Sequence, residues 1–347
     1  MVFQDSSTRD SRLVVLGAGN WGTTIASLFA PSRPTVLLTR TAEQANLMVS
    51  QRINKSYLPD FTLPDSLIIS SVDAFTIEER DVVFIAVPSH RVREAVEPLK
   101  EQLKGGLVVN GAKGFDHSTL KTMSELLIEL LPDTAVVTFS GPNIAREIAA
   151  GKPTRAVLAG KRLEALSRAS RMLSHPRLTL ETSRDVRGVE IAASLKGILA
   201  ITIGMADELE LGDNFNGLLM TYGLREFLTL ATFLGASEST VYGIAGLGDL
   251  VTSSLSPAGR NRKFGQLLAS GTDPDTALGK VGMVVEGVEM LKTVTKLQEL
   301  NISLPLFTVV RDIIEAGGEH AREKLTDAVL HYGTPISTNQ KDGFAVE

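Results

Sequence analysis

A single lysine, Lys196, interrupts the apolar run EIAASLKGILAI at residues 190–201. Burying an ammonium group costs free energy unless the charge is paired or the proton is lost. Lys196 therefore either extends to the protein surface or lies in a pocket where it takes part in chemistry. Gly197 follows it and disfavours a helix by about 1 kcal/mol relative to alanine, so the presence of glycine at this position also needs an explanation.

A glycine-rich turn, LVVLGAGNWG, follows a strand-like run and opens a helical pattern near the N-terminus. Gly17 permits a tight turn, Gly19 leaves room for a pyrophosphate, and Gly22 allows the helix and strand to pack closely. The N–H groups of the helix N-terminus then favour phosphate. The array predicts dinucleotide binding, with a purely structural turn as the alternative.

The residue that would face the adenosine ribose lies about 20 positions beyond the first glycine. NAD sites usually have Asp or Glu there, whereas this chain has Arg40. A guanidinium can pair with a 2′-phosphate, so the sequence favours NADP as the cofactor. The alternative is an arginine that stacks on adenine and leaves NAD acceptable as well.

A second anion site is indicated by the run GRNRKFG, which begins a predicted helix at residue 260. The helix N–H groups, Arg260 and Asn261 together would form a receptor for a small phosphate. A solvated basic helix start is the alternative. Two further groups lie where a ligand could reach them. Lys113 follows the strand-like run GLVVNGA, and Asp249 follows three glycines in GIAGLGDL, which we interpret as a loop.

Two kinds of structure must position these residues. Apolar strand-like runs alternate with helical patterns over the first half, and continuous apolar strands separated by helices imply a mostly parallel sheet covered on both faces. The runs lie at 12–17, 35–40, 81–87, 106–112, 135–141 and 154–160, and the helical patterns at 21–30, 41–52, 90–103, 118–131, 143–150 and 161–173. From about residue 186 only helical patterns follow, at 186–206, 214–235, 260–270, 284–300, 305–316 and 319–331. We therefore predict an α/β Rossmann-type domain at 12–187 and an all-α substrate-binding and catalytic domain at 188–335.

The composition excludes several other classes. The 347 residues carry a formal net charge of −5 and no long basic run, which argues against a nucleic-acid partner. Cysteine is absent, so disulfides and thiolate metal sites are excluded, and the histidines show no metal-ligand spacing. The N-terminus lacks the apolar core of a signal peptide, and no uncharged apolar stretch approaches the roughly 20 residues that span a bilayer. We expect a cytoplasmic protein without stable membrane insertion.

Eight short motifs follow one another along the chain: GAGNWGT, VPSH, AKG, SGPN, SLKG, AGLGDL, GRNRKFG and VVEG. Over residues 12–331 they resemble the NAD(P)-dependent glycerol-3-phosphate dehydrogenases. The resemblance implies reversible reduction of dihydroxyacetone phosphate to sn-glycerol 3-phosphate, the precursor of glycerophospholipids. It also implies a small phosphorylated substrate and a homodimer formed through the helical domain.

The same resemblance implies roles for individual residues. Lys196 is the expected acid that protonates the alkoxide and the base in the reverse reaction, with Asp249 holding it and Lys113 as a second active-site lysine. Burial and Lys113 would lower the pKa of Lys196, and Asp249 would oppose that shift. The expected substrate-binding residues are Lys113, Gly141, Asn143, Lys196, Asp249, Ser253, Gly259, Arg260 and Asn261. The expected cofactor-binding residues are Gly17, Gly19, Asn20, Trp21, Gly22, Arg40, Lys113, Ala145, Arg260, Val284 and Glu286, and no metal is expected.

Three positions depart from the usual family pattern. Gly197 replaces an asparagine, Gly259 replaces the serine that bacterial members often have, and Asn143 replaces a serine or threonine. The lost amide at 197 would leave space for a larger phospho-ketone, so an alternative function is a related NADP-dependent dehydrogenase of a different phosphorylated hydroxy-ketone. A non-catalytic dinucleotide-binding protein is the remaining alternative, but it would have no use for Lys113, Lys196 and Asp249.

Overall fold

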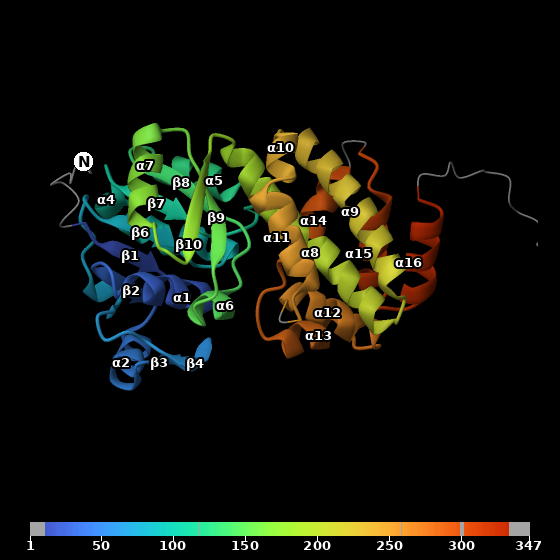
Figure 1. Cartoon of the computed structure of the whole chain (residues 1–347), viewed down its shortest axis with the longest axis horizontal. Helices are drawn as coiled ribbons and strands as arrows, with labels where there is room; N and C mark the ends of the chain where they lie inside the picture. The colour runs from blue at the N-terminus through green and yellow to red at the C-terminus, as the bar shows by residue number, and fades with distance from the viewer. Residues whose placement is uncertain (1–10, 117, 258, 299–301, 333–347) are drawn as a thin grey trace, which may run out of the picture.

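The computed structural model describes residues 11–116, 118–257, 259–298 and 302–332. The predicted domain end at 335 and the last two residues of the helix predicted at 284–300 lie outside these residues. A sheet-containing part and an all-helical part lie side by side, and the helix α8 (Val186–Glu208) begins the helical part (Figure 1). The α/β fold followed by an all-α region is confirmed.

An eight-stranded sheet forms the first part, with the order β10-β9-β8-β7-β6-β1-β2-β5. All neighbours are parallel except β8 and β9, so the predicted, mostly parallel sheet is confirmed. The chain crosses over beside β1, whose two neighbours are β2 and β6, and this crossover opens a crevice at the carboxyl ends of the strands. The strands are β1 Leu13–Leu16, β2 Thr35–Thr39, β5 Ile68–Ser71, β6 Val82–Ile85, β7 Leu107–Asn110, β8 Ala135–Ser140, β9 Thr154–Ala159 and β10 Leu178–Ser183.

Helices cover both faces of this sheet because alternate strand residues point to opposite sides. Leu13 and Val15 of β1 pack into a cluster with α1, α2 and α7, whereas Val14 and Leu16 pack into a second cluster with α3, α4 and α5. The helices are α1 Asn20–Phe29, α2 Ala42–Gln51, α3 Val92–Val96, α4 Lys100–Leu103, α5 Met123–Leu130, α6 Ala145–Ala149 and α7 Leu163–Met172.

The structure differs from the predicted elements where local chemistry overrides the hydrophobic pattern. The helix predicted over 90–103 is divided into α3 and α4 around Pro98, which has no N–H for the helix ladder. The helix predicted from 118 begins at Met123, after Thr122 and Glu125 form a capping box. Four strands were missed because their patterns are polar or interrupted: β5, β10 and the hairpin of β3 (Ile53–Asn54) and β4 (Leu58–Thr62).

The helical part is built around α8, whose residues from Val189 to Ala206 are all buried. This helix is long and apolar enough to cross a membrane, but the protein itself covers all of that stretch, as expected of a core helix. It packs against α9, α11, α12 and α14. The remaining helices are α9 Asp213–Phe233, α10 Glu238–Val241, α11 Asp249–Leu255, α12 Arg260–Ala269, α13 Pro274–Val281, α14 Glu286–Gln298, α15 Pro305–Glu315 and α16 Ala321–Leu330.

Candidate active site

The glycine turn lies between β1 and α1, at the crevice beside β6. Gly17 has a φ of +110°, which favours glycine, and its N–H donates to Leu38 O of the next strand at 3.0 Å. A Cβ on Gly22 would lie 1.9 Å from Gly17 O, whereas a Cβ on Gly19 would meet no atom within 4 Å. The helix and strand therefore need Gly22, and the open space above Gly19 at the N-terminus of α1 fits the pyrophosphate of a dinucleotide.

Three other predicted cofactor residues surround this turn. Asn20 is the first residue of α1, and its Oδ1 is buried without a partner among the described residues. Arg40 directly follows β2 and is exposed, next to the N-cap of α2. The Trp21 ring packs against Phe84 and Phe139, with its centroid 5.8 Å from that of Phe139, which gives Trp21 a structural contact within the α/β core.

The two predicted lysines meet on one carboxylate. Lys113, just beyond β7, donates to Asp249 Oδ2 at 2.7 Å and to Gly141 O at 3.3 Å, and Lys196 of α8 donates to the same Oδ2. All three side chains are largely buried, with Lys196 and Asp249 only 9% and 3% exposed. Asp249 was expected in a loop. It is instead the first residue of α11, because the glycine-rich segment Ile244–Gly248 coils into a π-helical turn.

Burial and neighbouring charges shift the pKa values of the two lysines in opposite directions. Burial, helped by the positive charge of Lys113, lowers the pKa of Lys196 to about 8 against the attraction of Asp249. Burial also opposes the charged form of Lys113, but Asp249 outweighs it and raises the pKa of Lys113. Lys196 is therefore suited to exchange a proton near neutral pH, whereas Lys113 stays charged.

The predicted phosphate receptor lies at the start of α12. Gly259 is its N-cap and Arg260 its first residue, with Arg260 Nη2 3.5 Å from Glu286 Oε1. Asn261 Oδ1 accepts from the N–H of Gly287 at 2.9 Å, which leaves the amide nitrogen as a donor. The N-termini of α12 and α14 thus lie together, and Arg260 carries its charge at their junction.

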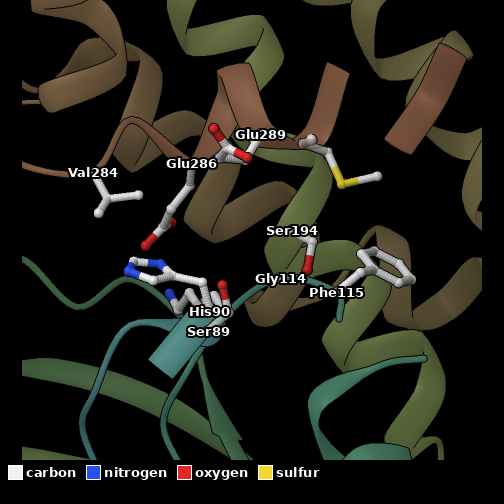
Figure 2. Close-up of a pocket in the computed structure, with 10 residues that line it drawn as sticks. Ser89, His90, Gly114, Phe115, Ser194, Val284, Glu286 and Glu289 are labelled. Atoms are coloured by element: carbon white, nitrogen blue, oxygen red, sulfur yellow. The ribbon is translucent and has the colours of Figure 1, made fainter. Parts of the chain in front are cut away.

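A pocket opens between the two parts of the chain (Figure 2). In Figure 2 the side chains of His90 and Glu286 point toward one another across it. Of its lining, the sequence had singled out Lys113, Val284 and Glu286. VPSH and AKG follow parallel strands and so belong at the ligand-binding edge of the sheet. Six other lining residues were nevertheless not predicted as site residues: Ser89, Gly114, Phe115, Ser194, Glu289 and Met290.

The other predicted substrate residues lie on segments next to the lysine cluster. Gly141 has a φ of +136° and presents its carbonyl to Lys113. Asn143 follows two residues later, and both polar atoms of its buried amide have no hydrogen-bond partner among the described residues, as expected of a group that binds a ligand. Ala145 begins α6, which packs against α1. Ser253 lies one turn after Asp249 on α11.

Gly197 does not leave the space that the sequence suggested. A Cβ at this position would lie 2.7 Å from both Cα and N of Gly287 and 3.2 Å from Asn261 Nδ2. The backbone of α14 therefore occupies the volume beside Gly197, and the expectation of a vacated space for a larger substrate is wrong. Glycine is needed here because two helices approach one another closely.

No cluster of three or more His, Asp or Glu side chains with metal-binding geometry occurs among the residues that the structure describes. The site brings together the cations Lys113, Lys196 and Arg260, the carboxylate Asp249 that the two lysines share, and Glu286 beside Arg260. This arrangement can bind an anion and exchange one proton beside it.

Comparisons with known proteins agree with this geometry. Residues 12–166 match the N-terminal profile, and residues 185–323 the C-terminal profile, of NAD-dependent glycerol-3-phosphate dehydrogenase. The glycerol-3-phosphate dehydrogenase [NAD(P)+] of Thermoanaerobacter sp. (strain X514) is 40% identical over 309 residues, covering 88% of this chain and 93% of the relative. That of Desulfitobacterium hafniense (strain Y51) is 35% identical over 312 residues, covering 89% and 88%.

A solved glycerol-3-phosphate dehydrogenase from Coxiella burnetii superposes with a TM-score of 0.82 at 29% identity, covering 92% of this chain and 98% of that structure. The resemblance inferred from the eight motifs is thus confirmed over both parts of the molecule. The chain belongs to the NAD(P)-dependent glycerol-3-phosphate dehydrogenase family.

Proposed function

We propose that this protein reduces dihydroxyacetone phosphate to sn-glycerol 3-phosphate, and runs the reverse reaction, with the residues around Lys113, Lys196 and Asp249. The observation that carries the proposal is the pair Lys113 and Lys196 on one carboxylate, Asp249. The phosphate receptor of α12 supports it, since a substrate of this kind needs an anion site and a proton donor.

The phosphate of the substrate binds to Arg260, to the amide nitrogen of Asn261 and to the N-terminus of α12. Arg260 exchanges its exposed ion pair with Glu286 for this contact. Asn143 and the backbone at Gly141 hold the hydroxyl end of the substrate, with Ser253 and Gly259 completing the wall. These contacts fix the carbonyl oxygen against Lys196 and lower the entropic cost of reaching the transition state.

A bound nicotinamide cofactor supplies and removes the hydride. Lys196 donates its proton to the C2 oxygen as negative charge develops there, and it accepts that proton in the reverse direction. Lys113 remains charged and stabilises the same oxygen, while Asp249 holds both ammonium groups in place. After reduction Lys196 is neutral, and it regains a proton from solvent before the next cycle.

The cofactor is held by the glycine turn, with Gly17, Gly19, Asn20 and Gly22 at the pyrophosphate and Arg40 at a 2′-phosphate, so NADP is preferred over NAD. Trp21, Lys113, Ala145, Arg260, Val284 and Glu286 complete its site. We further propose a cytoplasmic homodimer whose product enters glycerophospholipid synthesis.

The test is the oxidation of NADPH and NADH by the purified protein with a panel of phospho-ketones. We expect dihydroxyacetone phosphate to give the highest kcat/KM, and NADPH to have the lower KM of the two cofactors. A much higher kcat/KM with another phospho-ketone would overturn the substrate, and NADH as the better cofactor would overturn the role of Arg40.

A further inference from the structure

Glu190 is a buried carboxylate on α8 that the reaction does not use. It is 4% exposed and accepts four hydrogen bonds. Its Oε1 accepts from Asn110 Nδ2 at 3.0 Å, from the Ser124 N–H at 2.8 Å and from Thr138 Oγ1 at 3.1 Å, and its Oε2 accepts from Ser124 Oγ at 2.5 Å. All these donors belong to the α/β part, so this one side chain fastens α8 to β7, β8 and the start of α5.

The contact with Asn110 leads directly to the second lysine. Asn110 ends β7, and its amide group also bonds the backbone of Ala112 twice: Oδ1 accepts from the N–H at 3.0 Å, and Nδ2 donates to the carbonyl at 3.1 Å. Lys113 is the next residue. The amide of Asn110 thus fixes the backbone from which Lys113 reaches Asp249.

The other end of this network leads to Lys196. Glu190 and Lys196 lie on the same helix six residues apart, and the helix between them is buried throughout. A continuous path therefore runs from Lys196 through α8 to Glu190, to Asn110 and to Lys113.

The chemistry of Glu190 suits this task. Four donors converge on it, and an ionised carboxylate can accept from all of them, whereas an amide carries only one acceptor oxygen. Burial raises the pKa of Glu190, and the hydrogen bonds from Ser124 and Thr138 oppose that shift. Such a fully bonded polar group in a dry interior holds its partners more rigidly than apolar packing does.

We propose that Glu190 is a positioning residue that acts through Asn110 to fix the distance between Lys113 and Lys196. It touches neither substrate nor cofactor. The inference rests on the proposed function for the roles of the two lysines, but it concerns a contact between the two parts of the molecule.

The first test compares Glu190→Gln with Asn110→Ala. Glu190→Gln keeps the size of the side chain. Asn110→Ala removes the bonds of Asn110 to Glu190 and to Ala112, and it leaves Ser124 and Thr138 as donors to Glu190. Because a misplacement of about 1 Å can cost on the order of 100-fold, we expect each variant to lose tenfold or more in kcat, with each KM changed less than threefold.

The distinguishing measurement is the pKa of Lys196. If Lys113 moves away, Lys196 loses a repelling positive charge and becomes the only lysine paired with Asp249. Its pKa therefore rises above that of the wild type. The basic limb of the pH profile should therefore move to higher pH in both variants. Acetylation of Lys196 by acetic anhydride at a series of pH values, followed by peptide mass spectrometry, reads the same shift without turnover.

Glu226→Gln is the matched control, because Glu226 is another buried carboxylate, held by the backbone N–H groups of Leu306 and Phe307 away from the lysines. We expect it to leave the pKa of Lys196 unchanged. Variants at 190 and 110 that lose stability but keep the wild-type kcat and labelling profile would overturn the proposal and leave Glu190 a structural anchor. A wild-type protein inactive on dihydroxyacetone phosphate would overturn the proposed function instead, since the labelling profile does not depend on the substrate.

Discussion

At the scale of single residues, the site depends on one carboxylate that serves two ammonium groups. Asp249 contacts Lys113 and Lys196 through the same oxygen, so the cluster keeps an excess positive charge. In a protein of net charge −5, these three side chains give a phosphorylated substrate a local cationic group, beside the carboxylates Glu286 and Glu289 that also line the pocket. Local charge of this kind raises the rate of encounter with anions more than it raises their final affinity.

The first prediction concerns Lys196→Ala. Loss of the proton donor should reduce kcat by on the order of 100-fold or more, while the cofactor dissociation constant stays within a few-fold of wild type. Stopped-flow turnover and fluorescence titration with NADPH measure the two quantities. The exposed Lys263→Ala on α12 is the control, and a Lys196→Ala protein with near-normal turnover would contradict the assigned role.

The second prediction follows from the pKa of Lys196, about 8. Ketone reduction needs the protonated amine, so its kcat should be constant below this pH and fall as the pH rises through about 8. Oxidation of glycerol 3-phosphate needs the neutral amine, so its kcat should rise over the same interval. Measuring both directions from pH 6 to 10 checks the sign, and parallel profiles in the two directions would exclude Lys196 as the titrating group.

The third prediction concerns cofactor choice. Arg40 is exposed directly after β2, where a 2′-phosphate can pair with it in a site open to water. Arg40→Ala should raise the KM for NADPH by about tenfold, since a charge-assisted pair contributes about 1.5 kcal/mol, and should change the KM for NADH little. Equal losses for the two cofactors would show that Arg40 stacks on adenine instead.

At the scale of elements, the glycine pair Gly197 and Gly287 decides how closely α8 and α14 approach. Gly197→Ala would place a Cβ 2.7 Å from the backbone of Gly287, so α14 must move and carry Glu286 with it. We expect a loss of about 1–3 kcal/mol in unfolding free energy and a several-fold higher KM for the cofactor, measured by urea unfolding and initial rates.

The control for this variant is Gly217→Ala on α9, where an added Cβ meets no atom within 4 Å. There alanine should stabilise the helix by about 0.5–1 kcal/mol. A Gly197→Ala protein that behaves like Gly217→Ala would show that α8 and α14 have room between them.

The elements also show where prediction from sequence succeeds. The six apolar runs and the long helices could be predicted because their buried residues are apolar and recur with the spacing of a strand or a helix. The strands β4 and β10 could not, since only one residue of each is buried and β4 contains Pro59. The start of α11 at Asp249 could not be predicted either, because a glycine-rich π turn resembles a loop in sequence.

The site shows a similar division. Lys196, Lys113 and Asp249 could be predicted from motifs, whereas their meeting on one oxygen depends on packing between segments far apart in the chain. Glu190 is the first residue of the same apolar run as Lys196. A charge in such a run indicates a buried group that needs partners. Its hydrogen-bond partners lie 52 to 80 positions away in the sequence, and no motif predicts that they contact Glu190.

At the scale of the whole molecule, the buried carboxylates make stability depend on pH. Burial raises the pKa of Glu226 to about 7 against its hydrogen bonds to the α15 backbone. A raised carboxyl pKa adds stability that is fully present below its ordinary value of 4.5 and is lost as the pH rises through about 7.

Glu226→Gln should therefore flatten the fall in unfolding free energy between pH 5 and pH 8, by up to about 1.4 kcal/mol per pH unit. Urea unfolding at several pH values measures it, with Glu238→Gln on the exposed surface of α10 as the control. Identical slopes for the wild type and Glu226→Gln would rule out this carboxylate as the source.

Because α8 is buried on every side, helical structure and turnover should return at different times when the protein refolds. A helix in a protein gains most of its stability from tertiary packing, and most contacts of α8 are with α9, α11, α12 and α14, which follow it along the chain. The loops that bring them together must close before their contacts can form. Lys196 meets its partner Asp249 only when α11 packs against α8. In refolding, we therefore expect turnover to return after the helical circular dichroism signal has recovered.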